Sequence, residues 1–272
     1  MEFVIKPKKG LAVIDFKELW RYRELFYFLA WRDIKVRYKQ TALGIAWAVL
    51  QPFIMMVVFS TIFGKVAGIP SDNTPYPIFV YTGLLLWNVF SSSLSSASSS
   101  LVNSAMIIQK VYVPKVIIPA ATIIVSLVDF FFAFLVLAGI MVYYGFVPKF
   151  AGLFFLPLVL SITVVVSLGL GWFLSAFNVK YRDVRYILPF FIQLLIFVTP
   201  VIYPASIVPA AYRWILALNP MTGVIETFKA AFLGTNPVDW ATLGISAGMS
   251  IVFLIFGLWY FLKTERTFAD VI

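Results

Sequence analysis

The chain has 272 residues, 62% of them hydrophobic, and its 21 Lys and Arg residues outnumber its 12 Asp and Glu residues. It contains no Cys and no His, which excludes disulfides, thiolate metal sites and Cys nucleophiles and removes the commonest general base. We therefore expect an all-α integral membrane protein that binds no metal or cofactor itself. We expect no nucleic acid as partner, because the basic residues flank apolar segments.

The N-terminal segment 1–43 is basic and precedes the first apolar run. Steps of three and four residues from Lys17 reach a face that is charged at six of its seven positions: Lys17, Arg21, Glu24, Phe28, Arg32, Lys35 and Lys39. Leu19, Phe26, Ala30 and Ile34 lie on the opposite side. We expect an amphipathic helix in the membrane interface with its apolar face toward lipid.

Six apolar segments within 44–262 are about long enough to cross the hydrocarbon. They cover residues 44–63, 78–99, 116–144, 153–177, 186–202 and 241–262. With the N-terminus inside, segments 1–43, 100–115, 178–185 and 263–272 hold 17 of the 21 basic residues. The charge rule thus predicts six spans, with both the N-terminus and the short tail 263–272 in the cytoplasm.

Two polar features interrupt the predicted spans. Asp129 lies within the third, where a charge costs about 2.5–3.5 kcal/mol, so we expect a hydrogen bond to Ser or Thr on a neighbouring helix. Coupling to protons is the alternative for Asp129. A Ser-rich run over 91–96 occupies the second span. Small residues there favour close helix packing, whereas wetting of a pore is the alternative.

The segment 203–240 lies outside in this topology, yet it is largely apolar. Four prolines interrupt it, and the run 221–233 is typical of a short helix that Gly234 ends. We expect short re-entrant helices before the last span, because such backbone is tolerated where protein buries it. An extracellular loop lying flat on the membrane is the alternative.

Three stretches of sequence carry a family resemblance. They are WRDIKVRYKQTALGIAWAVLQP at 31–52, NVKYRDV at 178–184 and LNPMT at 218–222. Together they resemble the permease subunits of type-two ABC transporters, and most of all the exporters of O-antigen, capsule and teichoic acid. The resemblance extends from about Asp15 to Arg266.

The resemblance implies partners and a substrate. The permease would form a homodimer in the inner (cytoplasmic) membrane and bind two copies of a cytoplasmic ATP-binding subunit. Its cargo would be a glycan linked to polyprenyl pyrophosphate. The chain contains no Gly-x-x-x-x-Gly-Lys-Ser/Thr loop, so ATP and Mg would be bound, and ATP hydrolysed, by the separate subunit.

The resemblance also implies which residues act. In the permease family the first and fifth spans border the substrate pathway, and aromatic faces can pack against sugar rings. The expected pathway residues are therefore Trp47, Phe59, Phe190, Phe191 and Phe197. A lipid-facing or interfacial position is the alternative for each. The loop 101–114 would be the coupling helix that enters the ATPase, with Gln109, Lys110, Val111 and Tyr112 near its end.

Four cations just inside the membrane, Arg32, Lys35, Arg37 and Lys39, could attract a pyrophosphate headgroup. Ordinary positive-inside charge explains them equally well. Two other functions remain open. A proton-coupled secondary transporter would use Asp129 but usually has inverted repeats. A membrane enzyme acting on lipid or glycan would lack His and have few intramembrane carboxylates.

Overall fold

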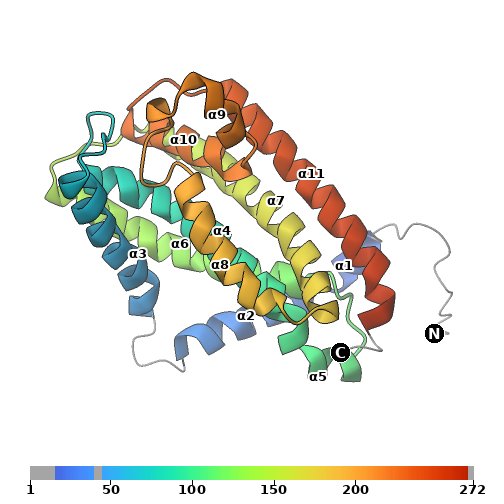
Figure 1. The fold of residues 1–272 in the computed structure, drawn as a ribbon. Helices are drawn as coiled ribbons and strands as arrows, with labels where there is room; N and C mark the ends of the chain where they lie inside the picture. The colour runs from blue at the N-terminus through green and yellow to red at the C-terminus, as the bar shows by residue number, and fades with distance from the viewer. Residues whose placement is uncertain (1–15, 40–44, 269–272) are drawn as a thin grey trace.

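The computed structural model describes residues 16–39 and 45–268, and within those ranges it consists of helices joined by short loops, without strands. The long helices form a tilted bundle (Figure 1). They are α2 (Arg23–Lys39), α3 (Ile45–Phe59), α4 (Tyr76–Asn103), α6 (Ile117–Tyr143), α7 (Ala151–Lys180), α8 (Val184–Val198) and α11 (Trp240–Thr264). The shorter ones are α1 (Phe16–Arg21), α5 (Ala105–Lys110), α9 (Ala210–Ala217) and α10 (Pro220–Leu233). The expected all-α class is confirmed.

The two ends of the bundle differ. Figure 1 shows α5 projecting from one end, near the C-terminal ends of α7 and α11, with α9 and α10 at the other end. We call these the α5 end and the α9 end. A π-helical turn, Ser60–Val66, extends α3 toward the α9 end, and 3-10 turns cover Ala205–Ile207 and Glu265–Thr267.

Helix α4 lies at the centre of the bundle. Of its 28 residues, 18 are buried, and it packs mainly against α6 and α7. Helix α7 in turn packs along α11. Since α4 has few lipid-facing positions, polar side chains on it meet other helices or a cavity rather than hydrocarbon.

Five helical segments are long and apolar enough to cross a membrane: Ala46–Val66, Tyr76–Asn103, Ile117–Tyr143, Ala151–Lys180 and Trp240–Thr264. The fifth predicted span corresponds to α8, which has 15 residues. At 1.5 Å per residue it measures about 23 Å, less than the ~30 Å hydrocarbon core. It ends at Val198 because Thr199 is extended ahead of Pro200. The count of six spans stays a prediction.

Helix α10 confirms the short helix expected from the sequence. Its first turn is capped by the side chain of Asn219, which accepts a hydrogen bond from the backbone N–H of Met221. It ends where Gly234 adopts a left-handed conformation with φ of 71°. Twelve of its 14 residues are buried among α4, α7 and α11, whereas α9 exposes several apolar side chains. Whether either helix enters a membrane leaflet stays a prediction.

The apolar side of the N-terminal helices faces protein, and here the expectation of a lipid-facing surface is wrong. Leu29 and Ala30 of α2 are buried, and Leu19 and Phe26 pack against the same apolar cluster. That cluster joins residues of α4, α6, α7 and α11 near the α5 end. The helix covers it because these four helices leave an apolar surface there that would otherwise be exposed.

Candidate functional site

A polar groove opens between α3, α4, α6 and α8, with a volume of about 320 Å³. We call it the central groove. Its polar lining consists of Arg37, Gln51, Asn88, Ser91, Ser92, Ser95, Ser126, Asp129 and Gln193. In a bundle that is otherwise apolar, such a lining favours water or a hydroxyl-bearing molecule over a lipid chain.

The serine run of α4 has two faces. Ser93, Ser98 and Ser100 are buried, and the backbone carbonyl of Ser98 accepts a 2.9 Å hydrogen bond from Asn178 of α7. Ser92 and Ser95 instead line the central groove. One face of the run therefore packs against α7, while the other makes a polar wall, and wetting of a pore by that wall stays a prediction.

The hydroxyls of this wall are held in place by local hydrogen bonds. Ser91 donates to the carbonyl of Asn88 at 3.4 Å, and Ser126 of α6 donates to the hydroxyl of Ser92 at 3.2 Å. Among the described residues, the side-chain nitrogen of Asn88 finds no acceptor. The groove therefore presents both hydroxyl oxygens and an amide donor to a molecule inside it.

A second groove, of about 280 Å³, continues from the first toward the α5 end. We call it the basic groove, because Arg32 and Arg37 of α2 line it opposite Ser96 and Ser99 of α4. Arg37 lines both grooves. The two cavities thus follow one face of α4 over successive helical turns.

Asp129 is held by two side chains of α2. Its carboxylate lies 2.6 Å from a guanidinium nitrogen of Arg37 and accepts a hydrogen bond from the hydroxyl of Tyr38. Burial, and then the neighbouring carboxylate, raises the pKa of Tyr38, so this hydroxyl stays protonated and keeps donating. The expected Ser or Thr partner for Asp129 is wrong: α2 crosses α6 here and brings a cation within reach instead.

The predicted pathway aromatics lie beside the central groove rather than in its lining. Phe59 is buried, and its ring centroid lies 5.7 Å from that of Phe63. The other four are exposed: Trp47 on α3, and Phe190, Phe191 and Phe197 on α8. Their neighbours Ala48, Pro189 and Ile192 line the groove. The exposed four thus lie on the outer faces of the two helices that flank the opening, and their role stays a prediction.

The four predicted headgroup cations divide into two pairs. Arg32 and Arg37 line the basic groove, where Arg32 forms hydrogen bonds of 2.7 and 2.9 Å with Asp33. Lys35 and Lys39 are exposed, and the ammonium of Lys35 lies 5.4 Å from the ring centroid of Trp31. The structure therefore brings the two arginines together at the basic groove.

The four predicted coupling residues lie at the α5 end. Gln109 and Lys110 close α5, and Val111 and Tyr112 follow it with exposed side chains. Met106 on the same helix is also exposed. An apolar, protruding surface of this kind is typical of a contact with another protein.

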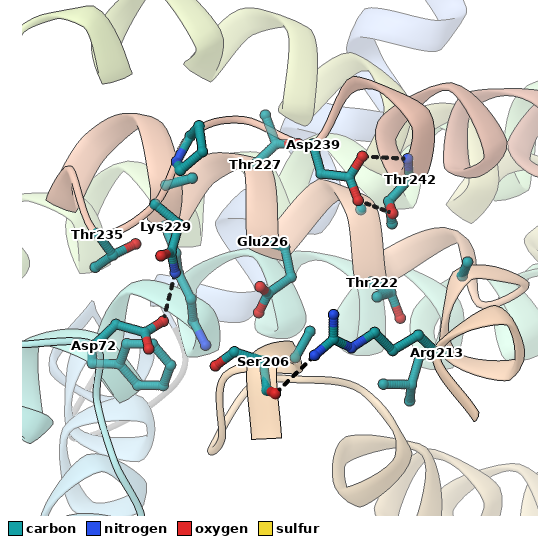
Figure 2. Close-up of a pocket in the computed structure, with 18 residues that line it drawn as sticks. Asp72, Ser206, Arg213, Thr222, Glu226, Thr227, Lys229, Thr235, Asp239 and Thr242 are labelled. Carbon is teal, nitrogen blue, oxygen red and sulfur yellow. Dashed lines mark hydrogen bonds between the residues drawn. The ribbon is translucent and has the colours of Figure 1, made fainter. Parts of the chain in front are cut away.

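A third cavity, of about 220 Å³, was not expected from the sequence. We call it the α10 pocket, because Thr222, Glu226 and Lys229 of that helix line it (Figure 2). The ammonium of Lys229 donates to the carbonyls of Pro200 and Val201 at 2.7 and 2.9 Å. Glu226 and Lys229, two charges within the apolar run 221–233, were the signal that could have pointed to this pocket.

A similar signal was available for the central groove. Gln51, Asn88 and Gln193 are uncharged polar residues within apolar runs, and all three line this cavity. Each is unremarkable alone. They are functional candidates because three different helices bring them to one opening.

Comparisons with known proteins agree with this architecture. Residues 24–233 match the family model described as ABC-2 type transporter. The chain is 31% identical over 257 residues to the O-antigen export system permease protein RfbA of Myxococcus xanthus, covering 93% of this chain and 97% of that protein. It is 26% identical to RfbA of Klebsiella pneumoniae, over 92% of this chain and 95% of that protein. It is 24% identical to the polysialic acid transport protein KpsM of Escherichia coli, over 84% and 88%.

Proposed function

This chain belongs to the ABC-2 type transporter family, and we propose that it is the membrane permease of an ATP-driven exporter of lipid-linked polysaccharide. Its relatives are permeases named for O-antigen export and polysialic acid transport. The cargo proposed here is a glycan carried on polyprenyl pyrophosphate, and the membrane is the inner membrane, with the α5 end in the cytoplasm.

The observation that carries the proposal is the polar wall of α4. Ser92 and Ser95 in the central groove and Ser96 and Ser99 in the basic groove face cavities along one side of the most buried helix. Neutral hydroxyls form weak hydrogen bonds that a sugar can exchange for those of water or of the next residue. Such a wall suits a polymer that must move on, whereas tight binding would stop it.

The central groove is open on one side in a single copy of the chain, which supports a homodimer. Helices α3 and α8 flank the opening and expose apolar side chains such as Phe53, Val57 and Leu194 in addition to the predicted aromatics. A second copy packed on α3 and α8 would cover that surface and place two central grooves face to face. The proposed passage is the space between them.

The proposed ATP-binding partner docks at α5. Met106, Val111 and Tyr112 form an exposed apolar surface, with Tyr112 71% exposed. Because the chain has no phosphate-binding loop of its own, the energy for export would come from that partner. Movement of α5 would reach the substrate path directly, since α5 follows α4 after one residue.

The two arginines of the basic groove are the proposed contact for the pyrophosphate. Arg32 and Arg37 lie at the α5 end of the polar wall, where a lipid-linked glycan would enter from the cytoplasm. A guanidinium binds phosphate oxygens through paired N–H groups. Lys35 and Lys39 would add attraction at longer range.

The proton-coupled alternative is not favoured. Asp129 is paired with Arg37 and hydrogen-bonded to Tyr38, so two side chains of α2 already donate to its carboxylate. A proton carrier must instead exchange its proton readily with a water-filled path. The contacts of Asp129 therefore support a structural role.

The proposal is tested by deleting the gene in its own host. We expect surface polysaccharide to disappear and lipid-linked glycan to accumulate inside the cell, and the wild-type gene to restore export. Unchanged surface polysaccharide in the deletion strain would refute the proposed function.

Variants separate the parts of the proposal. Tyr112→Asp should abolish co-purification of the ATP-binding subunit while leaving the permease in the membrane, and Tyr212→Asp on exposed α9 is the matched control.

Lys35→Glu with Lys39→Glu should weaken the stimulation of ATPase activity by lipid-linked glycan, whereas Lys65→Glu, exposed near the α9 end, should not. If a test variant and its control variant give the same result, the role proposed for the tested residues is refuted.

A further inference from the structure

The α10 pocket lies apart from the central groove, at the α9 end of the bundle. It is bounded by α9, α10, the start of α11 and the loop that carries Asp72. Figure 2 shows the carboxylate of Glu226 pointing into the space between Lys229 and Arg213. None of its residues belongs to the polar wall of α4, so the pocket requires its own explanation.

Two buried polar atoms in its lining lack a partner among the described residues. They are the hydroxyl of Thr222, whose residue is 2% exposed, and one carboxylate oxygen of Glu226, Oε1. A buried polar group left without a hydrogen bond costs about 1–3 kcal/mol. Both atoms belong to residues of one cavity, so a molecule with hydroxyl groups placed there would satisfy them together.

Several other polar groups of the pocket are already engaged. Asn236 donates to Asp72 at 2.9 Å, and Asp239 accepts from the first residues of α11. The guanidinium of Arg213 donates to the carbonyls of Val208 and Ser206 at 2.9 and 3.0 Å. These bonds fix the walls, and Thr222 and Glu226 carry the buried polar atoms of the pocket that lack a partner among the described residues.

The chemistry of the two free atoms restricts the ligand. A carboxylate oxygen requires a donor, and a hydroxyl can both donate and accept. Within the described part of the chain, no group of three or more His, Cys, Asp or Glu side chains could hold a metal ion. The lining carries three carboxylates, on Asp72, Glu226 and Asp239, against the two cations of Arg213 and Lys229, and this excess of negative charge disfavours an anion. Neutral sugar hydroxyls meet all of these requirements.

Size and shape agree with a single sugar unit. The cavity of about 220 Å³ is several times the ~30 Å³ share of one water molecule. Leu216, Ala217 and Pro237 supply apolar wall, against which the C–H face of a sugar ring can pack. The mixture of a few polar atoms and an apolar wall is that of a small-molecule site.

We propose that the α10 pocket binds one neutral sugar unit of the exported polysaccharide, with Glu226 and Thr222 hydrogen-bonded to its hydroxyl groups. This rests on the proposed function, because the cargo supplies the sugar and the α9 end is the exit side. The pocket would hold a unit that has left the passage.

The test uses a cysteine reporter, which the chain allows because it has no Cys. Thr235→Cys places a thiol on the pocket wall, and Val147→Cys places one on a loop at the same end, where Val147 is 82% exposed. The full chain in nanodiscs with its ATP-binding subunit is labelled with a maleimide. D-glucose, D-galactose, D-mannose, N-acetylglucosamine and D-glucuronate are added singly.

We expect at least one neutral sugar to slow labelling of Thr235→Cys threefold or more, while glucuronate and the Val147→Cys control show no change. Adding Glu226→Gln or Thr222→Val to the reporter should abolish the protection without altering the labelling rate in the absence of sugar or the melting temperature. Absence of protection by all four neutral sugars, or protection that persists in both variants, overturns the inference.

Polysaccharide export in cells that express the same reporter distinguishes the two proposals. Export that depends on the chain, combined with no sugar protection, refutes the α10 site alone. Surface polysaccharide that does not depend on the chain refutes the proposed function itself.

Discussion

Asp129 joins α6 to α2 through two contacts at the residue scale. Removing one partner of a buried ion pair leaves the other charge unpaired and costs about 3–5 kcal/mol. Here the side chain of Arg37 is 38% exposed and that of Asp129 is 14% exposed, so water screens the pair and the cost is smaller. The contact nevertheless helps to hold the C-terminal half of α2 against α6.

Arg37→Gln should destabilise the protein by about 1–3 kcal/mol, because the carboxylate of Asp129 loses its cation. At about 2–4 °C per kcal/mol the melting temperature in detergent falls measurably. Asp129→Asn removes the same ion pair from the other side. The double variant should therefore lose less stability than the sum of the two single variants. Strict additivity would show that the pair contributes nothing.

The partner of Asp129 could not be predicted from the sequence. A carboxylate within an apolar run requires a polar partner, and that much followed from the cost of burying a charge. The identity of the partner depends on how α2 crosses α6. Tyr38 and Asp129 are 91 residues apart in the sequence, so their contact leaves no local sequence pattern. Thr222 was missed for the same reason, whereas the charge of Glu226 in an apolar run was a signal that the sequence did offer.

At the scale of elements, α7 and α11 pack backbone against backbone at two glycines. A Cβ atom added to Gly257 would lie 1.8 Å from the carbonyl oxygen of Gly169. Backbone atoms are involved, so no side-chain rotation can relieve the overlap. Small residues at such a crossing let two helices in a membrane pack backbone to backbone.

Gly257→Ala should lower stability by about 1–3 kcal/mol or more, because α11 must move away from α7. Gly248→Ala on the same helix is the matched control, since its added Cβ would meet no atom within 4 Å, and we expect it to be neutral or stabilising. The measurement is the melting temperature of each variant in detergent, compared with that of the wild type. A control as damaging as Gly257→Ala would contradict this account.

The start of α11 carries a pH-dependent cap. Asp239 accepts hydrogen bonds from the backbone N–H groups of Ala241 and Thr242 and from the Thr242 hydroxyl, and chiefly this last bond lowers the pKa of Asp239 from its usual 3.8. Its stabilisation is fully present above about pH 4 and is lost as the pH falls through the lowered pKa.

Asp239→Ala should cost about 1 kcal/mol at neutral pH, the typical loss for an N-cap. The difference in melting temperature between wild type and variant should shrink below pH 4, where the cap protonates. A difference that stays constant from pH 7 to pH 3 would show that the carboxylate charge does not contribute.

Element type and number were largely predictable, and boundaries less so. Apolar run length predicted helices over α3, α4, α6, α7 and α11 within a few residues. The fifth span was extended past Pro200 to residue 202, although the residue before a proline disfavours helix. The surface covered by α2 was not predictable, because a charged face indicates amphipathicity without saying whether lipid or protein covers the other side.

At the scale of the whole molecule, the sequence predicted the fold class and the basic N-terminal segment, but it did not predict the central groove. Apolar segments and a basic N-terminus follow from composition. The central groove follows from which faces of α3, α4, α6 and α8 meet, and Gln51 and Gln193 become neighbours of one cavity only through that packing. The predicted aromatics lie on the adjoining exposed faces for the same reason.

We propose that the serine wall of α4 borders the route of the glycan. Ser95→Leu fills the central groove with an apolar side chain, whereas Ser161→Leu, exposed on α7, changes the same residue type away from it. Both variants are expressed in the deletion strain at wild-type membrane levels, and surface polysaccharide is measured over time. We expect Ser95→Leu to reduce export at least tenfold and Ser161→Leu to leave it unchanged. Normal export by Ser95→Leu would contradict the account.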